Sequence, residues 1–346
     1  MRKRLILFFF ALVLPLSAMA VDAQECVGRD LIAALRPEQK AELDRAVAAI
    51  PFNRGTLFEA RKGDARILLI GTYHFSDPRH AATIARFSDD LDSADALLVE
   101  AGPEEQARLS NELATNPALI ADTDGATLPE RMAPEDWARL SAAMTERGVP
   151  AFVASRMRPW YVAMMLGISP CMLDQVKASG KVEGLDHLLL ERAEAEGVPV
   201  VALEPWDTVF TLFAGMTPEE EIEMLQSALP AADHADDYAS TLINAFFSGK
   251  VWDIWEFGRI DAYENSGLSR EDVDHQIGLA QEKMMDQRNE SWIAPLVGAA
   301  DAAAKDKGHV VAAFGALHLP GERGVLRLLE REGFVVSALG PTGDAP

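Results

Sequence analysis

The chain has 346 residues, enough for one large domain or two moderate ones, and its 32 Lys and Arg against 54 Asp and Glu give a formal net charge of −22. Apolar residues make up 49% and charged residues 25%, which is typical of a globular protein rather than a disordered one. This acidity disfavours nucleic acid and anionic membranes as partners, and two cysteines are too few for a disulfide framework or a zinc ribbon.

The first twenty residues have the pattern of an export signal. Three basic residues, 2–4, precede an apolar run at 5–14, and Ala18-Met19-Ala20 is a small-x-small cleavage site. A membrane anchor is the alternative, but the apolar run is about half as long as a bilayer crossing requires. We therefore predict a signal peptide at residues 1–20, cleaved after Ala20, and a periplasmic or secreted mature protein without a transmembrane segment. Its net charge is −25, because the signal holds three of the 32 Lys and Arg and none of the 54 acids.

Export changes what the two cysteines, Cys26 and Cys171, are expected to do. In an oxidising compartment two thiols pair more often than they stay free. A bond between them would tie the mature N-terminus to the middle of the chain. The alternative is a pair of unrelated buried thiols, and only the geometry of the fold can distinguish the two. We predict the disulfide.

The first half of the mature chain predicts a βαβ unit. Residues 28–48 carry apolar side chains at an approximately helical period. The apolar run at 65–70 predicts a buried parallel strand that ends at Gly71, residues 79–92 predict a helix, and residues 96–100 predict a second buried strand. A strand, a helix and a strand within about 35 residues imply parallel pairing with a right-handed crossover.

The same alternation returns later in the chain. Helices are expected at 185–196 and 324–332, and strands at 199–204, 310–314 and 334–339. Two mainly helical stretches, roughly 104–178 and 217–307, lie between these blocks, and 341–346 is expected to be a loose tail. We therefore predict a single α/β domain over 21–340, with a mainly parallel central sheet, flanking helices and two helical insertions.

Polar side chains stand where the predicted strands end. Gly71-Thr-Tyr-His74 and Gly315-Ala-Leu-His318 follow two strands, and Glu100 and Glu204 end two others. Because the carboxyl ends of parallel strands meet at one edge of a sheet, these groups are expected to converge. Imidazole and carboxylate suit a divalent ion such as Mn, Co or Zn, whose bound water is a nucleophile near neutral pH. The alternative is structural: a strand-end His that bonds a loop carbonyl, or a carboxylate that caps a helix or pairs with Arg.

The other five histidines stand among charged or helical residues and are expected at the surface: His80, His187, His234, His275 and His309.

An arginine lies on an otherwise apolar helical stripe. Met284, Arg288 and Trp292 recur at every fourth residue and share one face of a predicted helix. A guanidinium in such a stripe needs an anion, either a buried carboxylate or the oxyanion that develops on a substrate. Alternatively, the Arg288 side chain extends past Trp292 to solvent.

Taken in order, these motifs resemble the TraB/GumN family, part of a wider group with PrgY, the Tiki proteins and the erythromycin-esterase/ChaN-like proteins. The resemblance covers nearly all of the mature chain and rests on Gly71–His74, Glu100, Gly184-Leu-Asp186, Val201–Glu204, Arg288-Asn289 and Gly315-Ala-Leu-His318-Leu-Pro-Gly321-Glu-Arg-Gly324. Residues 122–128 and Arg158-Pro-Trp160 resemble a branch of exported bacterial members. That branch also has a cysteine near each of the two positions found here, which supports the disulfide. Trp292 is a departure, since relatives often have Met there.

The resemblance implies an EreA/ChaN-like α/β core whose paired Gly-x-x-His motifs and glutamate form the active site. In the Tiki relatives this arrangement is associated with metal-dependent peptide cleavage. Carried over by position, it implies a metal or catalytic centre of His74, Glu100 and His318. It also implies that Arg288 and Asn289 are polar supports, with Glu204 as a further candidate.

Two functions of different classes are consistent with these motifs. The first is an exported metal-dependent hydrolase that cleaves a small peptide or a similar amide, with Glu100 as ligand or base and Arg288 at the oxyanion. The second is a non-catalytic periplasmic protein that sequesters a peptide, haem or a metal. A degenerate scaffold is disfavoured, because none of the matched polar positions is missing.

Overall fold

A six-stranded sheet in the order β4-β3-β5-β2-β1-β6 forms the centre of the computed structural model. The model describes residues 26–179 and 183–340, so the predicted signal peptide (1–20) and loose tail (341–346) lie outside the described residues. The strands are β1 (Leu57–Lys62), β2 (Ala65–Thr72), β3 (Ala96–Val99), β4 (Val200–Ala202), β5 (Val310–Gly315) and β6 (Val335–Ala338). Strands β4, β3, β5 and β2 are parallel, whereas β1 runs antiparallel to both β2 and β6. The predicted α/β fold with a mainly parallel sheet is confirmed.

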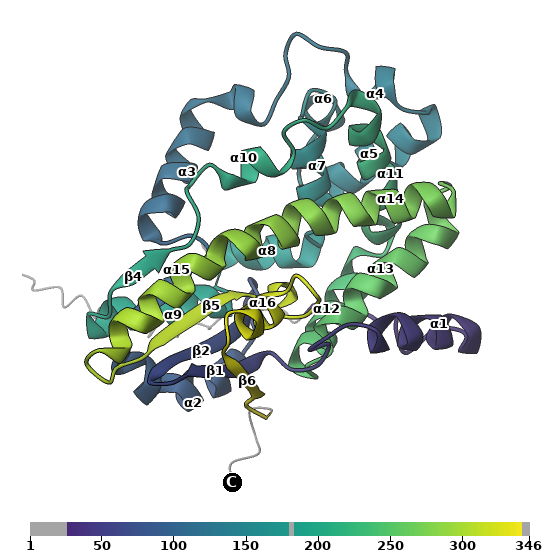
Figure 1. Ribbon diagram of the computed structural model, residues 1–346. Coiled ribbons are helices and arrows are strands. Elements are labelled where there is room, and N and C mark those ends of the chain that lie inside the picture. Colours follow the sequence, from purple (N-terminus) through teal and green to yellow (C-terminus); the bar gives the residue numbers. More distant parts are fainter. Residues whose placement is uncertain (1–25, 180–182, 341–346) are drawn as a thin grey trace, which may run out of the picture.

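Alternate residues of the buried strands pack against different helices, as the period of two requires. Leu68 and Ile70 of β2 belong to a core that includes residues of α2 and α9, whereas Ile67 and Leu69 belong to a core with α15 and α16. Figure 1 shows the sheet between these two pairs of helices. Their bounds are α2 (His80–Asp92), α9 (Leu185–Glu196), α15 (Gln287–Ala304) and α16 (Val325–Arg331).

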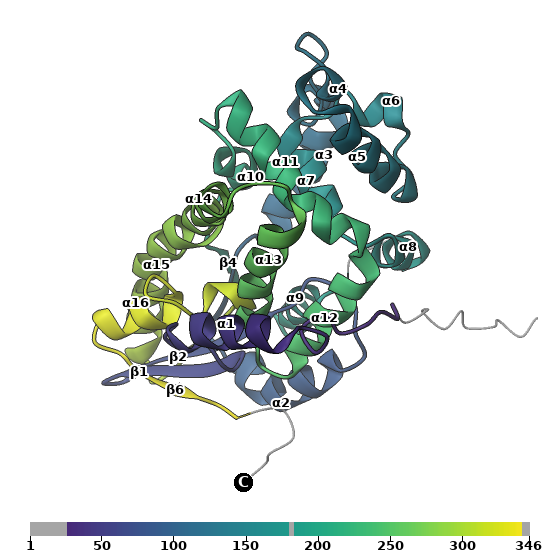
Figure 2. The ribbon, with the colours of Figure 1, turned by 90° about the vertical axis from the view of Figure 1, so that its right-hand side faces the viewer.

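The remaining helices extend beyond the sheet. Figures 1 and 2 both show α3 to α7 and α11 gathered at the top of the molecule, while α1 lies low beside α13. The bounds are α1 (Pro37–Ala48), α3 (Pro103–Thr115), α4 (Leu128–Arg131), α5 (Pro134–Glu146), α6 (Ala151–Ala154), α7 (Pro159–Leu166), α8 (Pro170–Ser179), α10 (Thr208–Leu212), α11 (Pro218–Asp233), α12 (Ala235–Phe247), α13 (Val251–Asn265) and α14 (Arg270–Gln281). Short 3-10 turns occupy Pro117–Leu119 and Ala316–His318, and a π-helix occupies Glu282–Asp286. None of the helices in the described ranges is both long and apolar enough to cross a bilayer.

Two local features differ from the sequence-based prediction. The helix predicted from residue 28 begins only at Pro37, because proline favours the first helical position and pushes the residue before it into extended backbone. Strand β1 was not predicted. Its Leu57, Phe58 and Ala60 are buried but its other residues are not, so it has neither a continuous apolar run nor a clean alternation.

Two of the histidines expected at the surface are buried, so those predictions are wrong. His80 is 1% exposed, and His309 is 9% exposed. His80 packs among Tyr73, Phe246 and Phe247, and its Nε2 lies 3.0 Å from the carbonyl oxygen of Phe75. Charged residues lie near His80 in the sequence, and two of its three aromatic partners, Phe246 and Phe247, come from the distant helix α12, so the sequence did not indicate this burial.

The pH dependence of stability is expected to report the burial of His80. Burial lowers the pKa of His80, although the Phe75 carbonyl opposes the shift. The unfolded chain therefore takes up the proton first, and stability falls as the pH drops through about 6.5. In urea denaturation, the His80→Phe variant should lose less unfolding free energy than the native chain between about pH 8 and pH 5.5. His275→Phe, at an exposed position, is the control; an equal loss in the native chain and His80→Phe would contradict the assignment.

The predicted disulfide is present. Cys26 and Cys171 are bonded, with their Cα atoms 5.7 Å apart and 145 residues apart in sequence. The bond fixes the segment before α1 next to α8. Further along the same segment, Arg29 pairs with Asp237 of α12 and the N–H of Leu31 donates to the Thr241 hydroxyl. The N-terminal segment is thus attached to two helices that border the cavity described below.

Candidate active site

The groups predicted at the strand ends meet at one edge of the sheet. His74 follows β2, Glu100 follows β3, Glu204 follows β4, and His318 follows β5. The backbone N–H of Glu204 donates to the carbonyl of Glu100, which keeps those two strand ends side by side. Four parallel strands therefore deliver their polar residues to the same place, as in other open α/β sheets.

Gly315 marks the point where three of these groups converge. A Cβ atom at this glycine would lie 3.3 Å from Glu100 Oε1, 3.5 Å from His318 Cδ2 and 3.6 Å from His74 Nε2. A Cβ here would be close only to Glu100 and in ordinary van der Waals contact with the two imidazoles, so the three side chains surround this one point. The structure thus brings together His74, Glu100 and His318.

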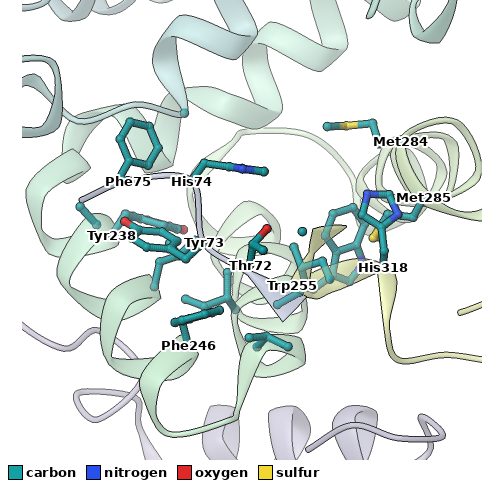
Figure 3. A pocket seen from close by; sticks show the side chains of 18 of the residues that line it. Thr72, Tyr73, His74, Phe75, Tyr238, Phe246, Trp255, Met284, Met285 and His318 are labelled. Atoms are coloured by element: carbon teal, nitrogen blue, oxygen red, sulfur yellow. The ribbon is translucent and has the colours of Figure 1, made fainter. Parts of the chain in front are cut away.

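A cavity of about 430 Å³ opens beside this centre. The polar centre contributes His74, Glu100, Arg288 and His318 to its lining. Figure 3 shows His74 and His318 on different sides of the space, with Thr72 between them in this view. Most of the remaining lining is apolar and comes largely from α12 and α13. The volume falls in the range of ligand-binding pockets.

Arg288 donates every one of its N–H groups within the protein. Its Nε and one terminal nitrogen donate to the Glu204 carboxylate at 2.6 and 3.0 Å, and that same nitrogen donates to Glu100 at 2.6 Å. The other terminal nitrogen donates to the Met284 carbonyl at 2.9 Å and to His318 Nε2 at 3.2 Å. A guanidinium has five N–H donors, so none is left over. Of the alternatives considered from the sequence, the buried carboxylate is the one observed.

A π-helix stands immediately before the helix that carries Arg288. It spans Glu282–Asp286, and α15 continues from Gln287. Such bulges are frequent at functional sites because they re-aim the side chains that follow. Met284 lines the cavity, while Trp292 N–H donates to Glu204 at 2.9 Å. The three residues of the predicted stripe therefore all border or support the centre.

Glu100 is held as a carboxylate. Burial alone would raise the pKa of the Glu100 carboxyl, but Arg288, His74 and the N–H of Gly315 outweigh burial and hold the pKa below its usual range. The Gly315 N–H donates to Oε1 at 2.6 Å, and Arg288 donates to Oε2. Ionised Glu100 is therefore an acceptor of hydrogen bonds and not a donor.

His318 is neutral, with its proton on Nδ1. Burial, followed by the charge of Arg288, lowers the pKa of His318 to about 3 despite the nearby Glu100 carboxylate. Its Nδ1 lies 2.6 Å from Asn289 Oδ1. The Asn289 amide nitrogen donates to the Arg323 carbonyl, which leaves its oxygen facing the imidazole. Nδ1–H thus donates to Asn289, and Nε2 carries the lone pair.

His74 has a partner that the sequence analysis did not assign to the site. Its Nδ1 lies 3.4 Å from Asp186 Oδ1 at the start of α9. Burial lowers the pKa of His74, but Asp186 and Glu100 outweigh it and raise the pKa to about 9. A Cβ at Gly184 would lie 2.3 Å from the His74 carbonyl carbon, so only glycine allows this approach. The Gly-Leu-Asp motif at 184–186 was the available signal.

The imidazoles of His74 and His318 and the carboxylate of Glu100 are ligand types that suit a divalent ion. Both imidazoles have their Nδ1 atoms next to an outer partner, Asp186 or Asn289, which is the usual arrangement around metal-binding histidines. Glu100 adds a carboxylate beside them. Within residues 26–179 and 183–340, however, no three His, Cys, Asp or Glu side chains are grouped closely enough to hold a metal ion. His318 Nε2 faces Arg288, so binding of an ion by this nitrogen would require the guanidinium to move.

Comparison with known proteins identifies relatives over most of the chain. The model of the TraB/PrgY/gumN family matches residues 56–338. The protein named "Uncharacterized protein YbaP" from Escherichia coli (strain K12) is 25% identical over 270 residues, which cover 77% of this chain and 89% of that protein. Its counterpart of the same name in Shigella flexneri gives the same identity and coverage. The matched region contains every strand and all of the polar residues described above.

Proposed function

The chain belongs to the TraB/PrgY/gumN family, and from that premise we propose that it is an exported metal-dependent hydrolase that cleaves a small peptide or a similar amide. The observation that carries the proposal is the convergence of His74, Glu100 and His318 around Gly315 at the mouth of an apolar cavity. Two imidazoles and a carboxylate next to a cavity of ligand size are the components of a hydrolytic centre.

A divalent ion, Mn, Co or Zn, is the proposed cofactor. His74, Glu100 and His318 would hold it, and when bound it would supply a nucleophilic water and polarise the scissile carbonyl. Asn289 orients the imidazole of His318, and Asp186 Oδ1 lies 3.4 Å from Nδ1 of His74. Arg288 fixes the Glu100 carboxylate and ties it to Glu204. Because Arg288 has no spare N–H, we assign it a positioning role rather than direct contact with an oxyanion.

Export is the second part of the proposal. The N-terminal signal pattern at 1–20 supports it, and so does the Cys26–Cys171 disulfide, because such bonds persist in oxidising compartments. The periplasm or the cell exterior is therefore the proposed location.

Metal content and peptide cleavage test the proposal together. The mature protein is expected to contain a stoichiometric amount of Mn, Co or Zn by elemental analysis, and to cleave members of a synthetic peptide mixture, detected by mass spectrometry. His74→Ala and His318→Ala should lose both the metal and the cleavage, because each removes an imidazole from the centre. His187→Ala, which removes a histidine paired with Glu191, is the matched control and should retain both.

The opposite result would favour a sequestering protein. A native protein without metal that retains peptides uncleaved, or that develops a haem Soret band on titration with hemin, would contradict the hydrolase.

A further inference from the structure

Beyond the polar centre, the cavity is a chamber lined by uncharged side chains. Helices α12 and α13 supply the largest share of this wall, chiefly through Ala235, Ala239, Leu242, Phe246, Val251 and Ile254. The one phenol on this wall, Tyr238, donates its hydroxyl to Asp261 at 2.5 Å and so has no free donor. The chamber therefore offers contact area for an apolar group rather than hydrogen bonds.

The charged end of the cavity disfavours an anionic ligand. Two carboxylates, Glu100 and Glu204, pair there with the single guanidinium of Arg288. All N–H groups of Arg288 already donate within the protein, so none is left for a ligand. Without the proposed divalent ion, a ligand carboxylate would meet a negative surplus and no unpaired guanidinium N–H, so an uncharged group suits this end better.

One buried hydroxyl on the cavity wall is unused. Thr72 is 3% exposed, and its Oγ1 has no hydrogen-bond partner among the described residues. Thr72 lines the cavity and pairs in register with Gly315, next to the polar centre. Figure 3 shows its hydroxyl pointing into the space near His74. An unpaired buried hydroxyl destabilises the free protein, and a bound acceptor would remove that penalty.

A second unpaired donor lies on the same wall. The indole N–H of Trp255 has no partner in the described part of the chain, whereas those of Trp252 and Trp292 donate to Glu256 and Glu204. Both unpaired groups can serve a ligand with carbonyl oxygens.

We propose that the cavity binds an uncharged amide with an apolar substituent on its acyl side, the substituent filling the α12–α13 chamber and the carbonyl oxygen accepting a hydrogen bond from the Thr72 hydroxyl. This deepens the proposed hydrolase by naming its substrate class. Two kinds of compound fit this description: a fatty-acyl amide, and a peptide whose amide bond follows an apolar residue.

Binding of small amides to the mature protein, measured by calorimetry, tests the inference without any turnover. Octanamide should bind more tightly than hexanamide, by about 4-fold for each added methylene. Octanoate should bind the metal-free protein more weakly than octanamide, because it is anionic. N-acetyl-leucinamide and N-acetyl-phenylalaninamide represent the peptide. Whichever group of ligands binds more tightly, fatty-acyl amides or amino-acid amides, identifies the class of substrate.

Thr72 variants supply the matched controls. Thr72→Val should weaken amide binding about 3- to 10-fold, and Thr72→Ser should restore it. Because the hydroxyl has no partner in the free protein, Thr72→Val should leave the urea midpoint unchanged or slightly higher. Ser227→Ala removes another buried, unpartnered hydroxyl that does not line the cavity and should bind amides as the native chain does.

The outcomes separate this inference from the hydrolase. Binding of neither amide class, affinity independent of chain length, or unchanged binding by Thr72→Val would overturn the inference even if the protein cleaves peptides. Amide binding with the expected dependence on chain length and Thr72, but without cleavage, would sustain the inference and count against the hydrolase.

Discussion

Replacing Arg288 by Met is expected to lower the free energy of unfolding by about 3 kcal/mol. The guanidinium is only 15% exposed and balances two carboxylates, Glu100 and Glu204, that are 21% and 9% exposed. Without it, two like charges stand side by side in a poorly solvated place. His318 Nε2 and the Met284 carbonyl also lose a donor. Urea denaturation of the variant and the native chain measures the difference.

A second substitution identifies the cause of that loss. Arg288→Met combined with Glu204→Gln should recover about 1 kcal/mol or more, because the neutral amide removes the like-charge repulsion while it can still accept from Trp292. Arg327→Met is the control for the loss of an arginine. Arg327 is 41% exposed and pairs with Glu330 at the surface, so it should cost less than about 1 kcal/mol. An effect of Arg288→Met no larger than that of Arg327→Met would show that the buried network does not stabilise the fold.

Loss of the disulfide is the second large effect. The Cys26→Ser/Cys171→Ser variant is expected to lose about 3–5 kcal/mol of unfolding free energy, because the bond closes a loop of 145 residues and the entropy it removes from the unfolded chain grows with loop length. The variant also frees the segment that packs on α12 through Leu31 and Thr241.

Reduction provides an independent measurement of the same bond. Dithiothreitol should lower the urea midpoint of the native protein toward that of the double serine variant, and it should leave the variant unchanged. Equal midpoints for the oxidised protein and the serine variant would contradict a stabilising role for the bond.

The sequence predicted that these residues would meet at one edge of the sheet, because they follow strands with strong local signals. Apolar runs at 65–70, 96–99 and 310–314 are typical of buried parallel strands, and the sheet edge follows from that pairing. The residues just beyond those runs, His74, Glu100 and His318, could therefore be assigned to one edge.

What could not be predicted depends on partners distant in the chain. Glu100 and Glu204 lie 188 and 84 residues from Arg288. No local sequence pattern therefore shows whether the N–H groups of Arg288 pair within the protein or remain available to a ligand. Asp186 reads locally as an acid in the first turn of a helix, and only the fold brings it to His74. The burial of His80 was missed for the same reason.

The partners of Arg288 also have a consequence for how the protein folds. The guanidinium joins groups that follow β3, β4 and β5 to a carbonyl of the π-helix. These segments are distant in sequence, and contacts between distant segments form slowly during folding. In a partly folded chain, only some of the carboxylates and hydrogen-bond donors around Arg288 are in place to pair with one another. We therefore expect the polar centre to form late in folding.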